Sequence, residues 1–280
     1  MGLENAENQK VILTYIGDGV AKLVVNNPPM NLVTPELVDE LRARLDEAEQ
    51  DERIRALVVT GAGERAFSTG SDIKVFPLVM DDPVGKKLRE ESRVFNKLAA
   101  LPKPTVAAIE GYACGGGVEL ALACDIRVAS EAAKFSLPEA KVGVFPSSGG
   151  VYRLPRLIGN SLALELMYLG EFIDAEEAKR IGLVNRLAPA GEAVNAAVEL
   201  ARKIADRPVE AIRAIKTCVL ASHTLTIEQN EELALSLCRD VYSSPDCLEG
   251  IRAFIEKRPP RFSYKRGDNP EDGQGTSHEQ

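Results

Sequence analysis

The chain has 280 residues, of which 45% are hydrophobic, 27% charged and 5% aromatic. This length accommodates one large domain, or one domain with an appended subdomain, and the composition excludes the disordered, collagen-like and coiled-coil classes. The formal net charge is −8, which argues against a diffuse basic surface, so we expect no nucleic-acid partner.

The first half of the chain alternates strand and helix signals. Val11–Ile16 and Val20–Val25 flank a Gly-Asp-Gly turn and predict a β-hairpin. A helix is predicted to begin at Thr34 and Pro35, because leucines recur after them at helical spacing. Further along, the periodicity predicts strands at 55–60, 104–109 and 126–129 and helices at 82–100 and 115–124.

The second half is almost wholly helical in its periodicity. From about Ser148 onward the predicted helices span 162–169, 174–181, 192–205, 208–221, 226–242 and 245–257. Residues 265–280 are polar and predict a disordered tail. The pattern therefore indicates an α/β core followed by a helical C-terminal section.

Several classes of protein are disfavoured by single residue types. Residues 1–10 have no signal-peptide pattern, and the least polar window, Thr105–Cys124, contains two glutamates, so we expect a cytoplasmic protein with no membrane partner. The five cysteines form no CxxC pair, and the two histidines, His223 and His278, lie far from any cysteine or acidic cluster. We therefore expect no metal site and no His-dependent triad, which leaves carboxylates, Tyr, Lys or Cys for acid–base chemistry.

Two glycine-bearing segments carry the chemistry, Ala66–Lys74 and Gly111–Asp125. In the second, three glycines separate a buried strand from an apolar helix, where backbone N–H groups are free to meet a ligand. Glu119 follows among apolar neighbours, which predicts a raised pKa and makes it a candidate functional acid, beside the alternative of an acid that complements the dipole of its helix. A third segment, Phe135–Pro146, carries another isolated acid, Glu139.

These segments together resemble the crotonase family, the enoyl-CoA hydratases and isomerases, from about Val11 to Phe262. The residues that carry the resemblance are Gly70-Ser-Asp-Ile-Lys74, Gly111-Tyr-Ala-Cys-Gly-Gly-Gly-Val-Glu-Leu120, Ala123-Cys-Asp125, Pro138-Glu139, Ser148-Gly-Gly150 with Arg153-Leu154, and Glu249–Arg258. The resemblance implies an α/β fold, a crotonase-like spiral of β-β-α units over residues 1–195, with a C-terminal helical segment at 196–264. It also implies a homotrimer or a dimer of trimers.

The resemblance further implies how a substrate is activated. The backbone amides of Ser71 and Gly116 would hold the thioester oxygen as it gains enolate charge. Glu119 would act as the base toward water attacking C3, and Glu139 would donate the proton to C2. The sequence departs from the family pattern at two positions. Ser71 stands where Ala is common, and Thr69 stands where a smaller residue is usual. The Thr69 side chain bears on the shape of the local cavity.

The implied substrate is a coenzyme A thioester, with no separate cofactor. The residues that would contact the coenzyme A part are Ala66, Ser68, Gly70, Asp72, Ile73 and Lys74, with Phe254 and Lys257 closing over it from the C-terminal helix.

The leading hypothesis is an enoyl-CoA hydratase, and other crotonase reactions stay open beside it. These are double-bond isomerisation, dehydration of a special hydroxyacyl-CoA such as carnitinyl-CoA, and thioester hydrolysis. A non-catalytic RNA-binding relative is disfavoured by the acidic excess over residues 34–50. The dinucleotide-like pattern Gly61–Ala66 lacks a following amphipathic helix, and Cys114 has no histidine to activate it, so we interpret the first as a turn and the second as a packed thiol.

Overall fold

The structure is a computed structural model that describes residues 9–263. These residues form two compact units that divide between Lys203 and Ile204, within helix α8. The division of the chain into a core at 1–195 and a helical segment at 196–264 stays a prediction. The predicted tail, 265–280, lies outside the described residues.

The first unit opens with the predicted hairpin and helix. β1 (Val11–Tyr15) pairs antiparallel with β2 (Val20–Val25) around the glycine turn. α1 (Pro35–Gln50) then begins after Thr34, whose hydroxyl accepts a hydrogen bond from the amide of Leu37 at 3.3 Å. Both predictions are confirmed.

The core of the first unit is a repeated β-β-α pattern. Three successive strand pairs each place their first strand in one sheet and their second strand in another. The pairs are β3 (Ala56–Gly61) with β4 (Ala66–Ser68), β5 (Thr105–Ile109) with β6 (Tyr112–Cys114), and β7 (Ile126–Ser130) with β8 (Lys134–Ser136).

Two sheets result from this alternation within the described residues. The larger has the order β1-β2-β3-β5-β7-β10, and the smaller has the order β4-β6-β8-β9. From β2 to β10 the strands of the larger sheet run parallel, as do β4, β6 and β8. The short strands β9 (Ile173–Asp174) and β10 (Arg186–Ala188) complete the edges.

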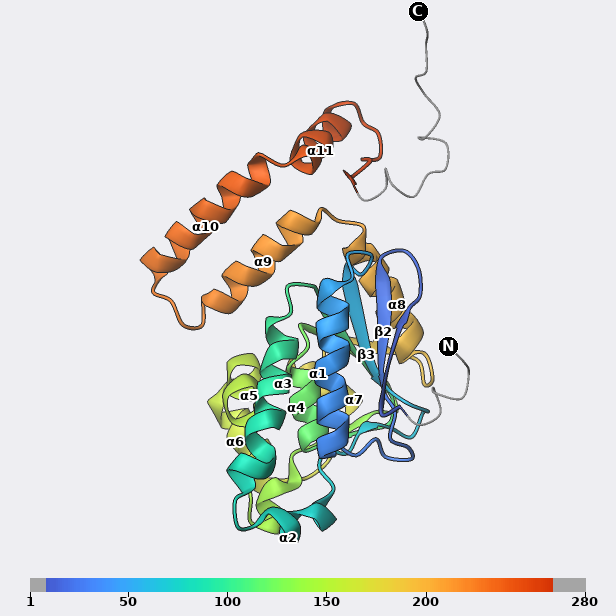
Figure 1. Ribbon diagram of the computed structural model, residues 1–280, viewed down its shortest axis with the longest axis vertical. Helices are drawn as coiled ribbons and strands as arrows, with labels where there is room; N and C mark the ends of the chain where they lie inside the picture. Colours follow the sequence, from blue (N-terminus) through green and yellow to red (C-terminus); the bar gives the residue numbers. More distant parts are fainter. Residues whose placement is uncertain (1–8, 264–280) are drawn as a thin grey trace, which may run out of the picture. The chain divides into compact units, whose positions relative to one another are not determined.

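Helical segments follow each strand pair. After β4 come η2 (Ile73–Val75), α2 (Phe76–Val79), the π-helical turn η3 (Val84–Leu88) and α3 (Arg89–Ala100), and after β6 comes α4 (Gly116–Leu122). After β8 come η4 (Pro138–Val142), α5 (Gly150–Ile158) and α6 (Asn160–Leu169), and then α7 (Ala175–Arg180) and α8 (Ala193–Ala205). Figure 1 shows α1 and α3 side by side.

The helices predicted at 82–100 and after Ser148 differ from the structure in detail. The first begins with the π-helical turn, where Asp82 accepts a hydrogen bond from the amide of Gly85 at 2.9 Å. The wholly helical expectation after Ser148 missed β9 and β10, because strands of two or three residues are too short to show a period. It also missed α5, which contains Pro155.

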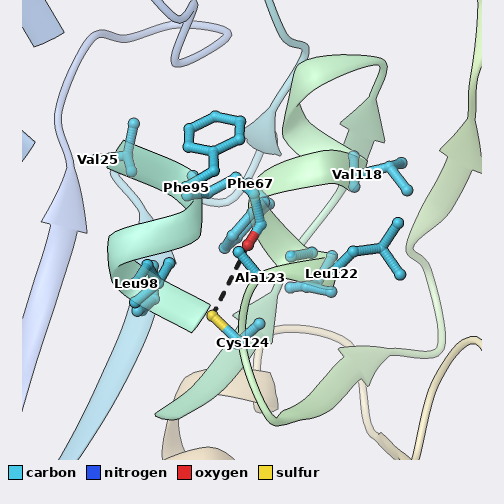
Figure 2. Packing of buried hydrophobic residues seen from close by; sticks show 14 of the residues in the cluster. Val25, Phe67, Phe95, Leu98, Val118, Leu122, Ala123 and Cys124 are labelled. Carbon is cyan, nitrogen blue, oxygen red and sulfur yellow. Dashed lines mark hydrogen bonds between the residues drawn. The ribbon is translucent and has the colours of Figure 1, made fainter. Parts of the chain in front are cut away.

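The core of the first unit encloses α4 on every side. Phe67 of β4 and Phe95 and Leu98 of α3 are fully buried near Val118 and Leu122 of α4 (Figure 2). All seven residues of α4 are buried, so this helix has no solvent-facing stripe. A polar side chain on α4 is therefore held among apolar groups.

The second unit contains α9 (Val209–Ala221), α10 (Ile227–Tyr242) and α11 (Pro245–Ile255), close to the predicted bounds. α9 and α10 lie side by side (Figure 1). α10 begins with a capping box in which Thr226 and Gln229 each hydrogen-bond the other's backbone amide. Over the described residues, none of the helices has both the length and the apolar character needed to cross a membrane.

Candidate active site

The two glycine-bearing segments meet where β4 and β6 end. These strands are parallel neighbours, so the loops that follow them emerge at the same edge of the smaller sheet. A Cβ placed on Gly70 would lie 2.7 Å from the amide nitrogen of Gly116, and a Cβ placed on Gly116 would lie 3.7 Å from the amide nitrogen of Ser71. The amides of Ser71 and Gly116 are therefore close neighbours.

Within the described residues, both amides are free of hydrogen-bond acceptors. α4 begins at Gly116, so this N–H has no acceptor in its own helix and lies at the positive end of the helix dipole. In residues 9–263, neither the Ser71 nor the Gly116 amide donates to a main-chain or side-chain acceptor. Such a pair of fixed N–H groups can stabilise an oxygen that gains negative charge, typically by roughly 3–4 kcal/mol per donor.

Glu119 is the polar side chain that α4 holds in the core. It is 3% exposed, and its Oε1 accepts a hydrogen bond from the amide of Gly150 at 2.9 Å. Burial raises the pKa of Glu119 to about 8, and the neighbouring carboxylates Glu91 and Glu139 add to the rise. The raised pKa predicted from the apolar neighbours of Glu119 agrees with this environment.

Glu139 lies on η4, a short helical turn that follows β8 and begins at Pro138. Its Oε1 lies 2.9 Å from the position that a Cβ on Gly115 would occupy, so its carboxyl group reaches the residue before the Gly116 amide. Its Oε2 is buried without a hydrogen-bond partner, and burial raises the pKa of this carboxyl group as well. An unpartnered buried carboxyl oxygen costs stability, which is typical of a group kept for chemistry.

A third buried carboxylate, Glu91, was not predicted from the sequence. It lies on α3, is 3% exposed, and pairs with Lys87 at 2.5 Å. The signal that could have revealed it is its position on the buried stripe of the helix, three and four residues before Val94 and Phe95.

The residues predicted to contact coenzyme A fall into three groups. Ala66 and Ser68 are buried and hydrogen-bonded to Asn31, through the Ala66 carbonyl at 2.7 Å and the Ser68 hydroxyl at 2.7 Å. Gly70 is buried, whereas Asp72, Ile73 and Lys74 begin the η2 turn, with the Asp72 side chain accepting from the Lys74 amide at 3.0 Å and Ile73 60% exposed.

The third group belongs to the second unit. Phe254 is 86% exposed near the end of α11, and Lys257 follows that helix with a φ of +53°. The role of both residues toward coenzyme A stays a prediction.

Asp125 and Cys114, two further residues of the glycine-bearing segment, have structural rather than chemical environments. Asp125 accepts hydrogen bonds from the amide and hydroxyl of Thr105 at 2.8 and 3.0 Å, so it satisfies local polar groups. Burial raises the pKa of the Cys114 thiol to about 11, which keeps it protonated and unreactive at neutral pH. Gly61–Ala66 leads from β3 into strand β4 rather than into a helix, which excludes the dinucleotide-binding interpretation.

Comparison with known proteins agrees with this geometry. A family model described as enoyl-CoA hydratase/isomerase matches residues 15–265. A Bacillus subtilis protein named "Probable enoyl-CoA hydratase" is 38% identical over 245 residues, which cover 87% of this chain and 95% of the relative. The short-chain-enoyl-CoA hydratase of Clostridium acetobutylicum is 36% identical, over 90% of this chain and 97% of that protein.

Solved structures give the same result. The crystal structure of an enoyl-CoA hydratase from Bacillus anthracis superposes with a TM-score of 0.87 at 35% identity, over 91% of this chain and 99% of that one. The predicted crotonase-like α/β fold is thereby confirmed. With the family model matching most of its length, the chain belongs to the enoyl-CoA hydratase/isomerase family.

Proposed function

We propose that this protein is an enoyl-CoA hydratase, a hydro-lyase that adds water across the C2–C3 double bond of a 2-enoyl-CoA thioester. The observation that carries the proposal is the pair of buried carboxyl groups with raised pKa values, Glu119 and Glu139, beside the free amide of Gly116. Its relatives named enoyl-CoA hydratase support the same reaction.

Hydration requires two proton transfers in opposite directions. In the form of the pair whose proton lies on Glu139, the carboxylate of Glu119 takes a proton from water as the water oxygen bonds to C3. The electrons of the double bond move onto the thioester oxygen, where the Ser71 and Gly116 amides hold the negative charge. Glu139 then gives its proton to C2, and transfer of the proton from Glu119 to Glu139 restores the starting state.

The electrostatics of the pair suit this sequence. Glu139 contributes to the raised pKa of Glu119, so the two carboxyl groups titrate as a coupled system. Near neutral pH such a pair favours holding one proton between its members, which supplies an acid and a base at once. Double-bond isomerisation needs only one of the two groups, so the presence of both favours hydration.

The test is the loss of the conjugated enoyl-thioester absorbance with crotonyl-CoA. We expect rapid hydration by the wild-type protein and a kcat lowered by about 10²–10⁴ in both Glu119→Gln and Glu139→Gln. If folded Glu139→Gln keeps most of the turnover, Glu139 is not the acid, and the result favours an isomerase over a hydratase.

The division of roles has its own assay. Exchange of the C2 protons of butyryl-CoA with D₂O needs a base at C2 but no water at C3. We expect Glu139→Gln to lose this exchange and Glu119→Gln to retain it. The reverse result would exchange the two assignments.

The remaining features follow from the same proposal. The thioester needs no redox cofactor or metal for this proton chemistry. The coenzyme A part would lie along the backbone of the 66–74 segment, with Lys74 as a further contact. We also propose a trimer or dimer of trimers, supported by exposed apolar side chains on the second unit, among them Ile215, Ile227 and Tyr242. A cytoplasmic location stays a prediction from the sequence.

A further inference from the structure

A buried ion pair lies beside the two free amides. The ammonium of Lys87, in the π-helical turn η3, is 2.5 Å from Oε2 of Glu91 in the first turn of α3. The two side chains are only 6% and 3% exposed. The pair is therefore not one of the solvent-exposed i,i+4 pairs that helices commonly carry.

Each member of the pair also holds a serine from another segment. Lys87 Nζ donates to the hydroxyl of Ser71 at 2.8 Å, and Glu91 Oε1 accepts from the hydroxyl of Ser148 at 2.7 Å. Ser71 supplies one of the two free amides. Ser148 is 1% exposed and precedes by two residues Gly150, whose amide donates to Glu119.

Glu91 also borders the second free amide. A Cβ on Gly116 would lie 3.9 Å from Glu91 Oε1. The negative charge of Glu91 contributes to the raised pKa values of both Glu119 and Glu139. The pair is thus in contact with the Ser71 loop and with the Ser148–Gly150 segment that holds Glu119, and it borders the start of α4.

Stability alone does not account for this arrangement. Removing two charges from water costs about as much as their attraction returns, so apolar residues of similar volume would stabilise the core at least as well. What an apolar replacement would lose is the directed hydrogen bonding to the two serines.

We propose that Lys87 and Glu91 are positioning residues for the active site. Through Ser71, Lys87 fixes the loop after β4 so that its amide and that of Gly116 converge on one oxygen. Through Ser148, Glu91 fixes the segment that holds Glu119. The inference rests on the proposed hydratase function for its kinetic part, but its geometric part concerns only how the two amides polarise a thioester carbonyl.

The experiment compares Glu91→Gln, Lys87→Met and the double variant, with Glu90→Gln as the matched control. Glu90 is the neighbouring acid on the same helix, partly exposed and paired with Arg93 at 2.7 Å. Three quantities are measured: kcat and KM for crotonyl-CoA, the melting temperature, and the absorption of a bound donor-substituted cinnamoyl-CoA. This probe absorbs further to the red when its thioester carbonyl is polarised, and it reports on the amides without turnover.

We expect kcat to fall by about 10- to 100-fold in each single variant with little change in KM, as for a displacement of reacting groups by about 1 Å. The red shift of the probe should shrink in parallel. Since Lys87 and Glu91 hold each other in place through their ion pair, either single variant already disturbs both serine contacts, and the double variant should be no worse than the more impaired single variant. Glu90→Gln should match the wild type in all three measurements.

The double variant keeps the test decisive if a single variant fails to fold around an unpaired buried charge. It removes both charges at similar volume, so its melting temperature should be retained. A folded double variant with wild-type kcat and wild-type red shift would overturn the proposal. If the wild-type protein shifts the probe but does not hydrate crotonyl-CoA, and the double variant loses that shift, the positioning role stands and the hydratase function falls.

Discussion

A methyl group added at Gly70 should impair catalysis far more than it impairs folding. Gly70 has a φ of +77°, and a Cβ there would lie 2.7 Å from the Gly116 nitrogen and 2.8 Å from the Cys114 carbonyl oxygen. Both atoms belong to the main chain, so restoring ordinary contact distances requires the loop and the start of α4 to separate by about 1 Å. That displacement acts directly on the Gly116 amide.

The size of the effect on kcat follows from the role proposed for the Gly116 amide. Losing one donor to a developing oxyanion lowers kcat by about 10²–10³, or roughly 3–4 kcal/mol of transition-state stabilisation. The left-handed backbone adds a folding cost of about 1–2 kcal/mol for any residue with a Cβ. For a chain of this size, that cost corresponds to a fall in melting temperature of roughly 2–8 °C.

Gly63→Ala is the matched control for Gly70→Ala. Gly63 has a similar φ of +73°, but a Cβ there would meet no atom within 4 Å. Both variants should therefore lose the stability that a positive φ costs, and Gly70→Ala should lose more because of its main-chain contacts. Only Gly70→Ala should lose kcat toward crotonyl-CoA and the red shift of the cinnamoyl probe. If folded Gly70→Ala has the same kcat as Gly63→Ala, the Gly116 amide does not hold the thioester oxygen.

Three further predictions concern charge and burial. The pKa of Glu119 rises on folding from about 4.3 to about 8, so wild-type stability falls as pH rises between these values. The melting temperature of Glu119→Gln should therefore increase relative to that of the wild type between about pH 5 and pH 9. Parallel plots of melting temperature against pH for the two proteins would contradict this. Arg258 lowers the pKa of Glu249 to about 2 through hydrogen bonds at 2.7 and 3.0 Å. The stability that this contact provides is lost as pH falls from about 4.3 toward 2. In thermal melts, Glu249→Gln should therefore be more destabilising at pH 7 than at pH 3. Arg127 is 4% exposed and donates hydrogen bonds to the carbonyls of Leu183 and Cys124 at 2.7 and 2.8 Å. Arg127→Met removes both bonds and should lower the free energy of unfolding, measured in urea, by about 1–3 kcal/mol for each bond lost. An unchanged urea midpoint would refute this.

The sequence predicted the parts of the site that depend on local pattern. Three consecutive glycines before an apolar helix indicated free amides, and a lone carboxylate among apolar residues indicated a raised pKa for Glu119. Both signals arise within one turn of α4, where every residue is buried. Glu139 could be singled out only as an isolated acid after a proline, because its approach to Gly115 depends on the pairing of β6 with β8.

The sequence could not predict the parts that depend on contacts between distant segments. Lys87 and Glu91 have the spacing of an ordinary surface ion pair, and although Glu91 lies on the buried stripe of α3, the contacts of the pair with Ser71 and Ser148 depend on packing between distant segments. The strands β4, β6 and β8 have three residues each, too few for an alternating pattern to emerge. These short strands nevertheless determine which loops meet.

The repeated topology explains why these particular loops build one site. β4, β6 and β8 are adjacent and parallel, so the segments that follow them emerge at one edge of the smaller sheet. Each repeat then supplies a different group there: the Ser71 amide after β4, the Gly116 amide and Glu119 after β6, and Glu139 after β8. Because the two amides come from different repeats, their separation is set by strand pairing and by the contacts between loops. The buried Lys87–Glu91 pair hydrogen-bonds Ser71 in the loop after β4 and borders the start of α4. It is therefore placed where it can set the geometry of both the Ser71 and the Gly116 amides.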